Sequence, residues 1–210
     1  MYLVKMPEII KPLASQFLWN MPRDERKVYL TFDDGPTPGI TDQILDILQE
    51  YNAKATFFCL GKQVELAPDL FERLVQEGHR IGNHTYSHPN GWKTTAFAYL
   101  KNVLQAEHFI QTDLYRPPYG RITRGQATAI RKRYHLVMWD IITGDFDLNT
   151  TPEECYERVA KHLEGGSIIV MHDSVKASKN VLGSVRPIIE HILSLGYELA
   201  PLPSAASLEE

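Results

Sequence analysis

The alternation of short apolar runs with amphipathic segments constrains the fold of this chain more than any other feature. Seven runs are long enough for one strand each, at residues 28–32, 55–60, 80–83, 114–116, 135–139, 167–171 and 197–200. Helical periodicity fills the intervals, at residues 40–51, 68–77, 94–112, 122–133, 151–163 and 185–195. Strands that alternate with helices predict parallel β-α units, and the apolar runs are typical of strands that are buried on both faces.

Seven such units predict an α/β fold, in which the strands form a deformed (β/α)7 barrel that is closed or nearly closed. An open, doubly wound parallel sheet is the alternative. A length of 210 residues suits one domain. We expect an N-terminal extension at residues 1–26, a catalytic domain at 27–203 and a polar tail at 204–210. In either architecture, functional side chains gather beyond the carboxyl ends of the strands.

Composition excludes several classes of protein. The formal net charge of -4 gives no sign of a nucleic-acid-binding surface. No apolar run approaches the ~20 residues of a transmembrane helix. Two cysteines, Cys59 and Cys155, cannot form a disulfide framework. The N-terminus does not resemble a signal peptide, because charged residues and prolines interrupt its apolar stretches. The sequence does not determine the cellular compartment, and a cytoplasmic protein is expected if this N-terminus is native.

Two adjacent carboxylates, Asp33 and Asp34, follow the first apolar run in the segment TFDDGP. Two carboxylates at the end of a buried strand are costly unless a cation or a proton compensates them. A helix cap followed by a turn at the Gly-Pro pair would explain the same residues without any function. The segment therefore indicates either a cation site or a turn.

Two histidines, His84 and His88, follow the third apolar run in the segment HTYSH. Their spacing would place both on one face of a helical turn, where both can reach one metal ion. Taken alone, the pair could equally consist of ordinary surface or core histidines that bind no metal. With one carboxylate of the Asp pair, they make a ligand set that leaves coordination positions open, as in catalytic sites. A metal there would acidify bound water, and the second Asp could serve as a general base.

The segment RPPYG, at residues 116–120, is stiffened by two prolines and can turn tightly at Gly120. A rigid loop of this kind can aim a backbone N–H at an oxyanion. Arg116 could hold a carboxylate through two hydrogen bonds. A rigid turn that carries a surface arginine is the alternative.

His172 directly follows the buried run at residues 167–171. A histidine at this place can donate a proton to a leaving group. The two residues before it, Val170 and Met171, offer apolar surface for a small acyl methyl group. An ordinary core strand that ends in a polar cap is the alternative.

Together these segments resemble the polysaccharide deacetylase family, also called the NodB homology domain or carbohydrate esterase family 4. TFDDGP, HTYSH and RPPYG match the first three motifs of the family in order and spacing, and the resemblance covers about residues 27–200. It implies a deformed (β/α)7 barrel and a carbohydrate substrate. It also implies a divalent metal ion, zinc in the first place, with cobalt or nickel as alternatives.

The resemblance also implies a role for each candidate residue. The implied metal ligands are Asp34, His84 and His88. Asp33 would be the base, and Arg116 would orient it. The backbone N–H of Tyr119 would help to hold the oxyanion, and His172 would be the general acid. The residues expected to contact the substrate are Pro118, Trp139, Val170 and Met171.

The fourth motif departs from the family pattern. The family commonly has a Trp-Asp-x-Asp-x-x-Asp-Trp-like run in which an internal Asp supports the acid histidine, whereas this chain has WDIITGDF at residues 139–146. On this alignment Ile142 stands in the position of the supporting Asp, and Phe146 replaces the final Trp. Three other carboxylates could support His172 instead, namely Asp140, Asp145 and Asp173.

The sequence leaves four hypotheses for function. The first is hydrolysis of the amide of an N-acetylated sugar, such as a glycan that contains N-acetylglucosamine. The second, within the same chemistry, is removal of an O-acetyl or formyl group from a lipid-linked or small sugar. A non-catalytic carbohydrate binder is the third, and it would not need paired carboxylates. The fourth, a metal-free hydrolase of non-sugar amides, is disfavoured by the pair His84 and His88.

Overall fold

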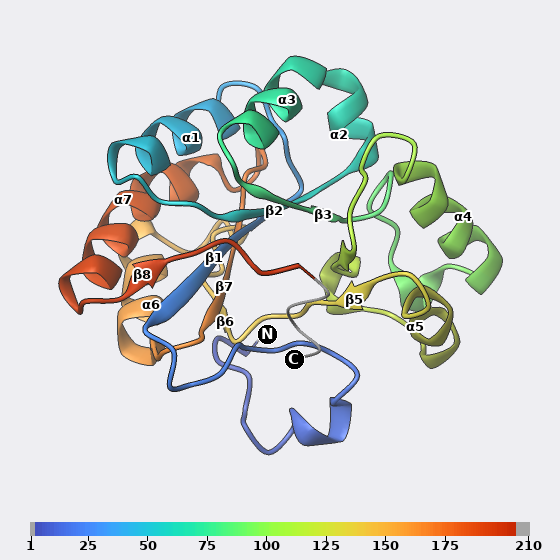
Figure 1. The fold of residues 1–210 in the computed structure, drawn as a ribbon, viewed down its shortest axis with the longest axis horizontal. Coiled ribbons are helices and arrows are strands. Elements are labelled where there is room, and N and C mark those ends of the chain that lie inside the picture. The colour runs from blue at the N-terminus through green and yellow to red at the C-terminus, as the bar shows by residue number, and fades with distance from the viewer. Residues whose placement is uncertain (1–2, 205–210) are drawn as a thin grey trace.

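The strands form one parallel sheet that curls nearly into a closed barrel (Figure 1). The structure is a computed structural model, and it describes residues 3–204. The strands are β1 (Lys27–Asp33), β2 (Thr56–Cys59), β3 (Arg80–Asn83), β4 (Leu114–Tyr115), β5 (His135–Leu136), β6 (Ile141–Ile142), β7 (Ile168–His172) and β8 (Glu198–Leu199). Their order is β5-β4-β3-β2-β1-β7-β6, and β8 pairs with β1 outside this path. The predicted deformed (β/α)7 barrel is confirmed.

Helices cover the outer side of the curled sheet (Figure 1). They are α1 (Thr41–Glu50), α2 (Gly61–Leu66), α3 (Pro68–Gln76), α4 (Ala96–Ala106), α5 (Arg124–Ile130), α6 (Pro152–His162) and α7 (Ser178–Ser194). Three short 3-10 helices are η1 (Pro12–Ala14), η2 (Gly91–Lys93) and η3 (Pro118–Gly120). No helix within residues 3–204 combines the length and the apolar character that crossing a bilayer would require.

Local sequence explains where these elements begin and which face they bury. Helix α1 buries Ile44, Leu45 and Leu48, which recur at helical spacing and pack into the core between helices and sheet. Helix α6 begins with a capping box, in which the Thr151 side chain accepts from the backbone N–H of Glu154. Cys59 and Cys155 are buried and free. The amphipathic pattern therefore orients each helix against the barrel.

Two short elements were not expected from the sequence, and among the helix boundaries the start of α7 differs most from its expected position. Strand β6 has only two residues and helix α2 only six, so neither shows a readable period. Helix α7 begins at Ser178, seven residues before the expected start at Val185, and continues through Pro187. The polar start of α7 lacks the apolar pattern on which the prediction relied.

Residues 3–26 bridge the opening between β5 and β6, as Figure 1 shows for the blue end of the chain. Leu18 donates to the Leu136 carbonyl (2.8 Å) and accepts from Met138 (2.7 Å), while Ile142 donates to the Val4 carbonyl (2.9 Å). The N-terminal extension therefore packs on the same barrel. The division at residues 26 and 27 stays a prediction, and residues 1–2 and 205–210 lie outside the described residues.

Asp140, next to β6, anchors this N-terminal segment. Its fully buried carboxylate accepts hydrogen bonds from Lys5 (2.9 Å), Lys11 (2.8 Å) and Arg23 (3.0 Å), and from the Ser167 hydroxyl (2.8 Å). Burial opposes ionisation, but these donors outweigh it and hold the pKa of Asp140 below its usual range. Asp140 is therefore a structural carboxylate at the closure of the barrel.

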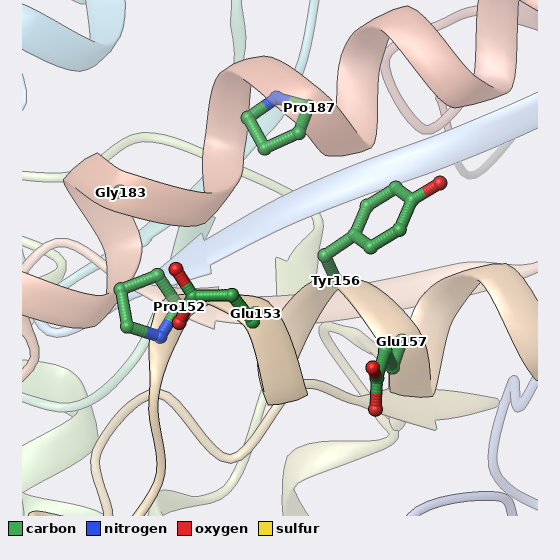
Figure 2. Close-up of a pocket in the computed structure, with 6 residues that line it drawn as sticks. All are labelled: Pro152, Glu153, Tyr156, Glu157, Gly183 and Pro187. Carbon is green, nitrogen blue, oxygen red and sulfur yellow. The ribbon is translucent and has the colours of Figure 1, made fainter.

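The outer layer contains a small groove between α6 and α7, shown in Figure 2. Its volume is about 280 Å³, and it is lined by Pro152, Glu153, Tyr156, Glu157, Gly183 and Pro187. A side chain at Gly183 would place its Cβ 2.8 Å from Pro152, so the close approach of the two helices requires glycine. None of these lining residues belongs to the site that the sequence predicts.

Candidate active site

Three side chains converge at the carboxyl ends of β1 and β3. Asp34 directly follows β1, His84 directly follows β3, and His88 lies in the loop that leaves β3. Nε2 of His88 lies 3.2 Å from Oδ1 of Asp34, and Nε2 of His84 lies 3.7 Å from the same oxygen. One ligand atom from each residue lies within 4.8 Å of the others. This arrangement can hold one metal ion.

The histidine pair does not sit on a helical turn, and that expectation is wrong. Thr85 and His88 adopt positive φ angles of 72° and 60°. The turn is held by side chains, because Thr85 donates to Asn83 Oδ1 (2.7 Å) and His88 donates to Thr85 Oγ1 (3.0 Å). An irregular, strained turn therefore brings the two imidazoles together.

The states of His84 and Asp34 suit a metal ion. Nδ1 of His84 lies 2.8 Å from the carbonyl of Arg116, which fixes its proton there and leaves Nε2 as the free acceptor. Burial lowers the pKa of His84 to about 4, so the ring is neutral at neutral pH. Burial alone would raise the pKa of Asp34, but His88 and the other histidines nearby hold it below its usual range.

The geometry of Asp34 Oδ1 supports the same conclusion. This oxygen is buried and lacks a hydrogen bond of good geometry, although two imidazole nitrogens face it. Buried polar atoms are usually satisfied, so an orphaned carboxylate oxygen indicates an absent partner. One carboxylate and two imidazoles are a donor set that fits a divalent transition metal.

The second carboxylate, Asp33, is held by a buried arginine. Nη1 of Arg116 donates to Asp33 Oδ1 (2.7 Å) and Thr31 Oγ1 (2.8 Å), and Nη2 donates to the Met138 carbonyl (2.8 Å). The arginine therefore uses one nitrogen for Asp33, whereas the sequence suggested a two-bond grip. Oδ2 of Asp33 lies 3.9 Å from Nε2 of His84, on the side of the metal ligands.

Asp145 supports His172. Its Oδ1 lies 2.8 Å from Nδ1 of the ring, and its Oδ2 accepts the backbone N–H of His172 (2.6 Å). Burial would lower the pKa of His172, but the charge and hydrogen bond of Asp145 outweigh it and raise the pKa to about 9. His172 therefore carries a proton at neutral pH.

Of the three carboxylates that the sequence offered in place of Ile142, the structure brings Asp145 to His172. Ile142 lies in β6 and pairs with Val170, and the chain then turns through Gly144 before it presents Asp145. Asp145 is the last Asp of the run and directly precedes Phe146, so alignment of the motif from its C-terminal end would have found it.

A polar brace beneath the metal loop was not predicted. Asp173 accepts from the backbone N–H of Gly35 (2.9 Å) and from the Thr41 hydroxyl (2.6 Å). A Cβ at Gly35 would lie 1.9 Å from Asp173 Oδ2, so no side chain fits there. Burial raises the pKa of Asp173 to about 7. The brace holds the turn that carries Asp34, whose φ is 86°.

A sequence model of polysaccharide deacetylases matches residues 20–137 of this chain, which contain the first three motifs. The chain belongs to the polysaccharide deacetylase family. The predicted family and the predicted class of enzyme, a hydrolase of carbon–nitrogen bonds in polysaccharides, are both confirmed.

Curated and solved relatives agree with this assignment. A peptidoglycan-N-acetylglucosamine deacetylase of Bacillus cereus is 34% identical over 198 residues, which are 90% of this chain and 71% of that protein. The peptidoglycan-N-acetylmuramic acid deacetylase PdaC of Bacillus subtilis is 31% identical, but this chain spans only 39% of its length. A crystal structure of a peptidoglycan N-acetylglucosamine deacetylase with an N-hydroxybenzamide compound has a TM-score of 0.87 and 30% identity, and covers 94% of this chain and 95% of its own.

In this polysaccharide deacetylase, Tyr119, the predicted oxyanion donor, lies at the site with only some of the residues that were expected to contact the substrate. Tyr119 is exposed, has a φ of 60°, and places its ring 4.4 Å from that of His88. Trp139 packs against Gly120, where an added Cβ would lie 2.7 Å from the indole. These two aromatic residues border the site.

The remaining predicted contacts are not brought to the surface. Pro118 is buried inside η3, and Val170 is buried in β7. Met171 is fully buried and belongs to the core between the sheet and the helices, so it faces away from the site. The expectation that Val170 and Met171 form an open acyl pocket gains no support, because alternate residues of a buried strand point into the barrel and into the helical layer.

Proposed function

We propose that this protein is a metal-dependent N-deacetylase that acts on N-acetylglucosamine residues of a peptidoglycan-type glycan. The proposal depends above all on the convergence of Asp34, His84 and His88 beside the buried pair of Asp33 and Arg116. The names of the relatives supply the substrate class. Zinc suits two imidazoles and a carboxylate, and cobalt and nickel accept the same donors.

When bound, such an ion would polarise the acetyl carbonyl and lower the pKa of a water molecule. Asp33 lies beside the triad and would take the proton from the attacking water. Arg116 keeps Asp33 in place through the hydrogen bond at 2.7 Å. The backbone N–H of Tyr119 would donate to the developing oxyanion.

His172 would deliver a proton to the departing amine. An amine leaves poorly unless it is protonated, and His172 is held as an imidazolium by Asp145. The charged histidine favours the amide over the ester reaction, since an ester can expel its alcohol with less help. A carbohydrate binder would need neither the buried ion pair of Asp33 and Arg116 nor the charged pair of Asp145 and His172.

The test is a substrate panel with protein reconstituted with zinc, cobalt or nickel. Release of acetate or formate is measured from peptidoglycan, chitooligosaccharide, acetyl-xylan and small N-acetylated sugars. We expect metal-dependent acetate release from the N-acetylated glycans, and loss of this activity after chelation and in Asp33→Asn. Release only from acetyl-xylan would contradict the amide assignment, and equal activity after complete metal removal would contradict the metal assignment.

A further inference from the structure

An exposed tryptophan is fixed in place near the His88 end of the site. Trp92 lies in η2 and is 65% exposed, although tryptophan is usually among the more buried residues. Its indole Nε1 donates to the Ile122 carbonyl (3.2 Å), and its backbone N–H donates to Asn90 Oδ1 (3.0 Å). These hydrogen bonds, rather than burial, hold the ring in one orientation.

Arg121 adds a cation to this indole. Its guanidinium carbon lies 5.2 Å from the ring centroid of Trp92. The two loops also touch through their backbones, since a Cβ at Gly91 would lie only 2.3 Å from the Arg121 carbonyl. The aromatic residue and the cation are thus presented by two loops in close contact.

The same two loops border the metal site. Tyr119 and His88 are in ring contact at 4.4 Å, and Trp92 follows His88 by four residues while Arg121 follows Tyr119 by two. Four residues of chain reach at most ~14 Å, and two reach at most ~7 Å. The backbones of Trp92 and Arg121 therefore lie no farther than these lengths from His88 and Tyr119, a span that an oligosaccharide can cover.

The charge of these loops differs in sign from that of the whole chain. Residues 89–95 and 119–125 contain Lys93, Arg121 and Arg124 and no Asp or Glu, whereas the chain as a whole carries -4. Arg186, by contrast, pairs with the carboxylate of Glu50. Cations in two touching segments that themselves carry no acidic residue attract an anionic ligand.

We propose that Trp92 and Arg121 form a second sugar-binding subsite beside the metal site. The indole stacks on the ring of the adjacent sugar, and the guanidinium binds a carboxylate that this sugar carries. An N-acetylmuramic acid residue next to the N-acetylglucosamine has this chemistry, because its lactyl ether ends in a carboxylate. This inference rests on the proposed function and names the residues that favour an acidic glycan over neutral chitin.

The test measures binding to metal-free protein, which does not depend on turnover. The probes are a tetrasaccharide of alternating N-acetylglucosamine and N-acetylmuramic acid with a free lactyl carboxylate, and chitotetraose. Calorimetry gives Kd for the parent, Trp92→Ala, Arg121→Gln and Arg121→Lys. Arg26→Gln is the matched control, because Arg26 also stacks on an aromatic ring, that of Tyr197 (5.7 Å), but lies before the opposite end of β1.

We expect Trp92→Ala to raise the Kd of both glycans by about threefold to tenfold, the scale of one aromatic contact. Arg121→Gln should weaken the binding of the acidic tetrasaccharide only, and Arg121→Lys should restore part of that affinity. High salt should reduce the difference in Kd between the parent and Arg121→Gln. Arg26→Gln should bind like the parent. Equal Kd values in all variants, from a parent that binds and deacetylates the glycan, overturn the subsite alone. A parent that neither binds nor deacetylates either glycan overturns the proposed function as well.

Discussion

Oδ1 of Asp145 lies 2.8 Å from Nδ1 of His172, while Oδ2 of the same carboxylate accepts the backbone N–H of His172 at 2.6 Å. One carboxylate thus fixes both the ring and the backbone of the histidine. Its position also sets which way the ring faces, because the proton on Nδ1 is directed at Asp145 and Nε2 lies on the other side of the ring. Substitution of Asp145 should therefore change the pKa of His172, which can be measured.

We expect Asp145→Asn to lower the pKa of His172 from about 9 to below the ordinary histidine value. The amide keeps the shape of the side chain but removes the negative charge, and the burial that opposes the imidazolium remains. Titration of metal-free, 15N-histidine-labelled protein by NMR would give both values. A His172 signal that titrates near the same pH in parent and variant would contradict the assignment of Asp145.

The same shift predicts the pH dependence of stability. The folded pKa of His172, about 9, lies above the unfolded value of about 6.5. The stabilisation by the pair with Asp145 is therefore complete below pH ~6.5 and is lost as the pH rises through about 9. Denaturant unfolding between pH 6 and 10 should show this loss in the parent and a smaller one in Asp145→Asn.

His84→Ala and His88→Ala should each bind zinc far more weakly than the parent, and neither should deacetylate. The fold should survive, because both residues lie in the loop beyond β3 rather than in the strand. Calorimetric titration with zinc tests affinity, and circular dichroism tests the fold. His108→Ala, on the segment after α4, is the control and should bind zinc like the parent. Unchanged zinc affinity in both site variants would remove the pair from the metal site.

Asp33→Asn should retain metal and lose about 10²-fold or more in kcat, because the amide cannot accept the proton of the attacking water. The hydrogen bond from Arg116 to Oδ1 can remain, so the variant should stay folded. The measurements are zinc affinity and kcat on one N-acetylated oligosaccharide. Full turnover in Asp33→Asn would exclude Asp33 as the base.

Asp140→Asn should lower stability without touching the site. It leaves the buried Lys11 and the partly buried Lys5 and Arg23 without their shared carboxylate. The loss of one partner from a buried ion cluster costs about 3 kcal/mol or more, which corresponds to a fall in Tm of roughly 6–12 °C for a chain of this size.

Thermal unfolding of Asp140→Asn checks the size of this effect. Glu50→Gln is the control, since its partner Arg186 lies at the surface and the change should leave Tm nearly unaltered. Equal Tm values in parent and Asp140→Asn would show that the N-terminal segment is held by other contacts.

The sequence predicted the barrel and the site where motif and periodicity agree. Asp33 ends an apolar strand, and Asp34 and Arg116 directly follow one, so the parallel topology alone brings them to one rim. The sequence could not show that Asp145 contacts His172, because that contact depends on how the chain turns at Gly144. The turn of His84 and His88 has the spacing of a helix but positive φ angles at two residues. Irregular backbone carries no period, so long-range contacts decide it.

His172→Ala tests the assignment of the leaving-group acid. Amide cleavage expels an amine that must be protonated, whereas ester cleavage expels an alcohol that needs less assistance. The variant should therefore lose about 10²- to 10⁴-fold in kcat/KM on an N-acetylated glycan and markedly less on a matched acetyl ester. In the parent, activity on the amide should decline as the pH rises toward about 9, where the imidazolium loses its proton.

The comparison requires matched amide and ester substrates, measured in parent, His172→Ala and Asp145→Asn across pH. Asp145→Asn keeps the imidazole but lowers its pKa, so its amide activity should decline at lower pH than that of the parent. Its ester activity should change less. Equal losses on amide and ester in His172→Ala, or no loss on the amide, would show that another group protonates the amine.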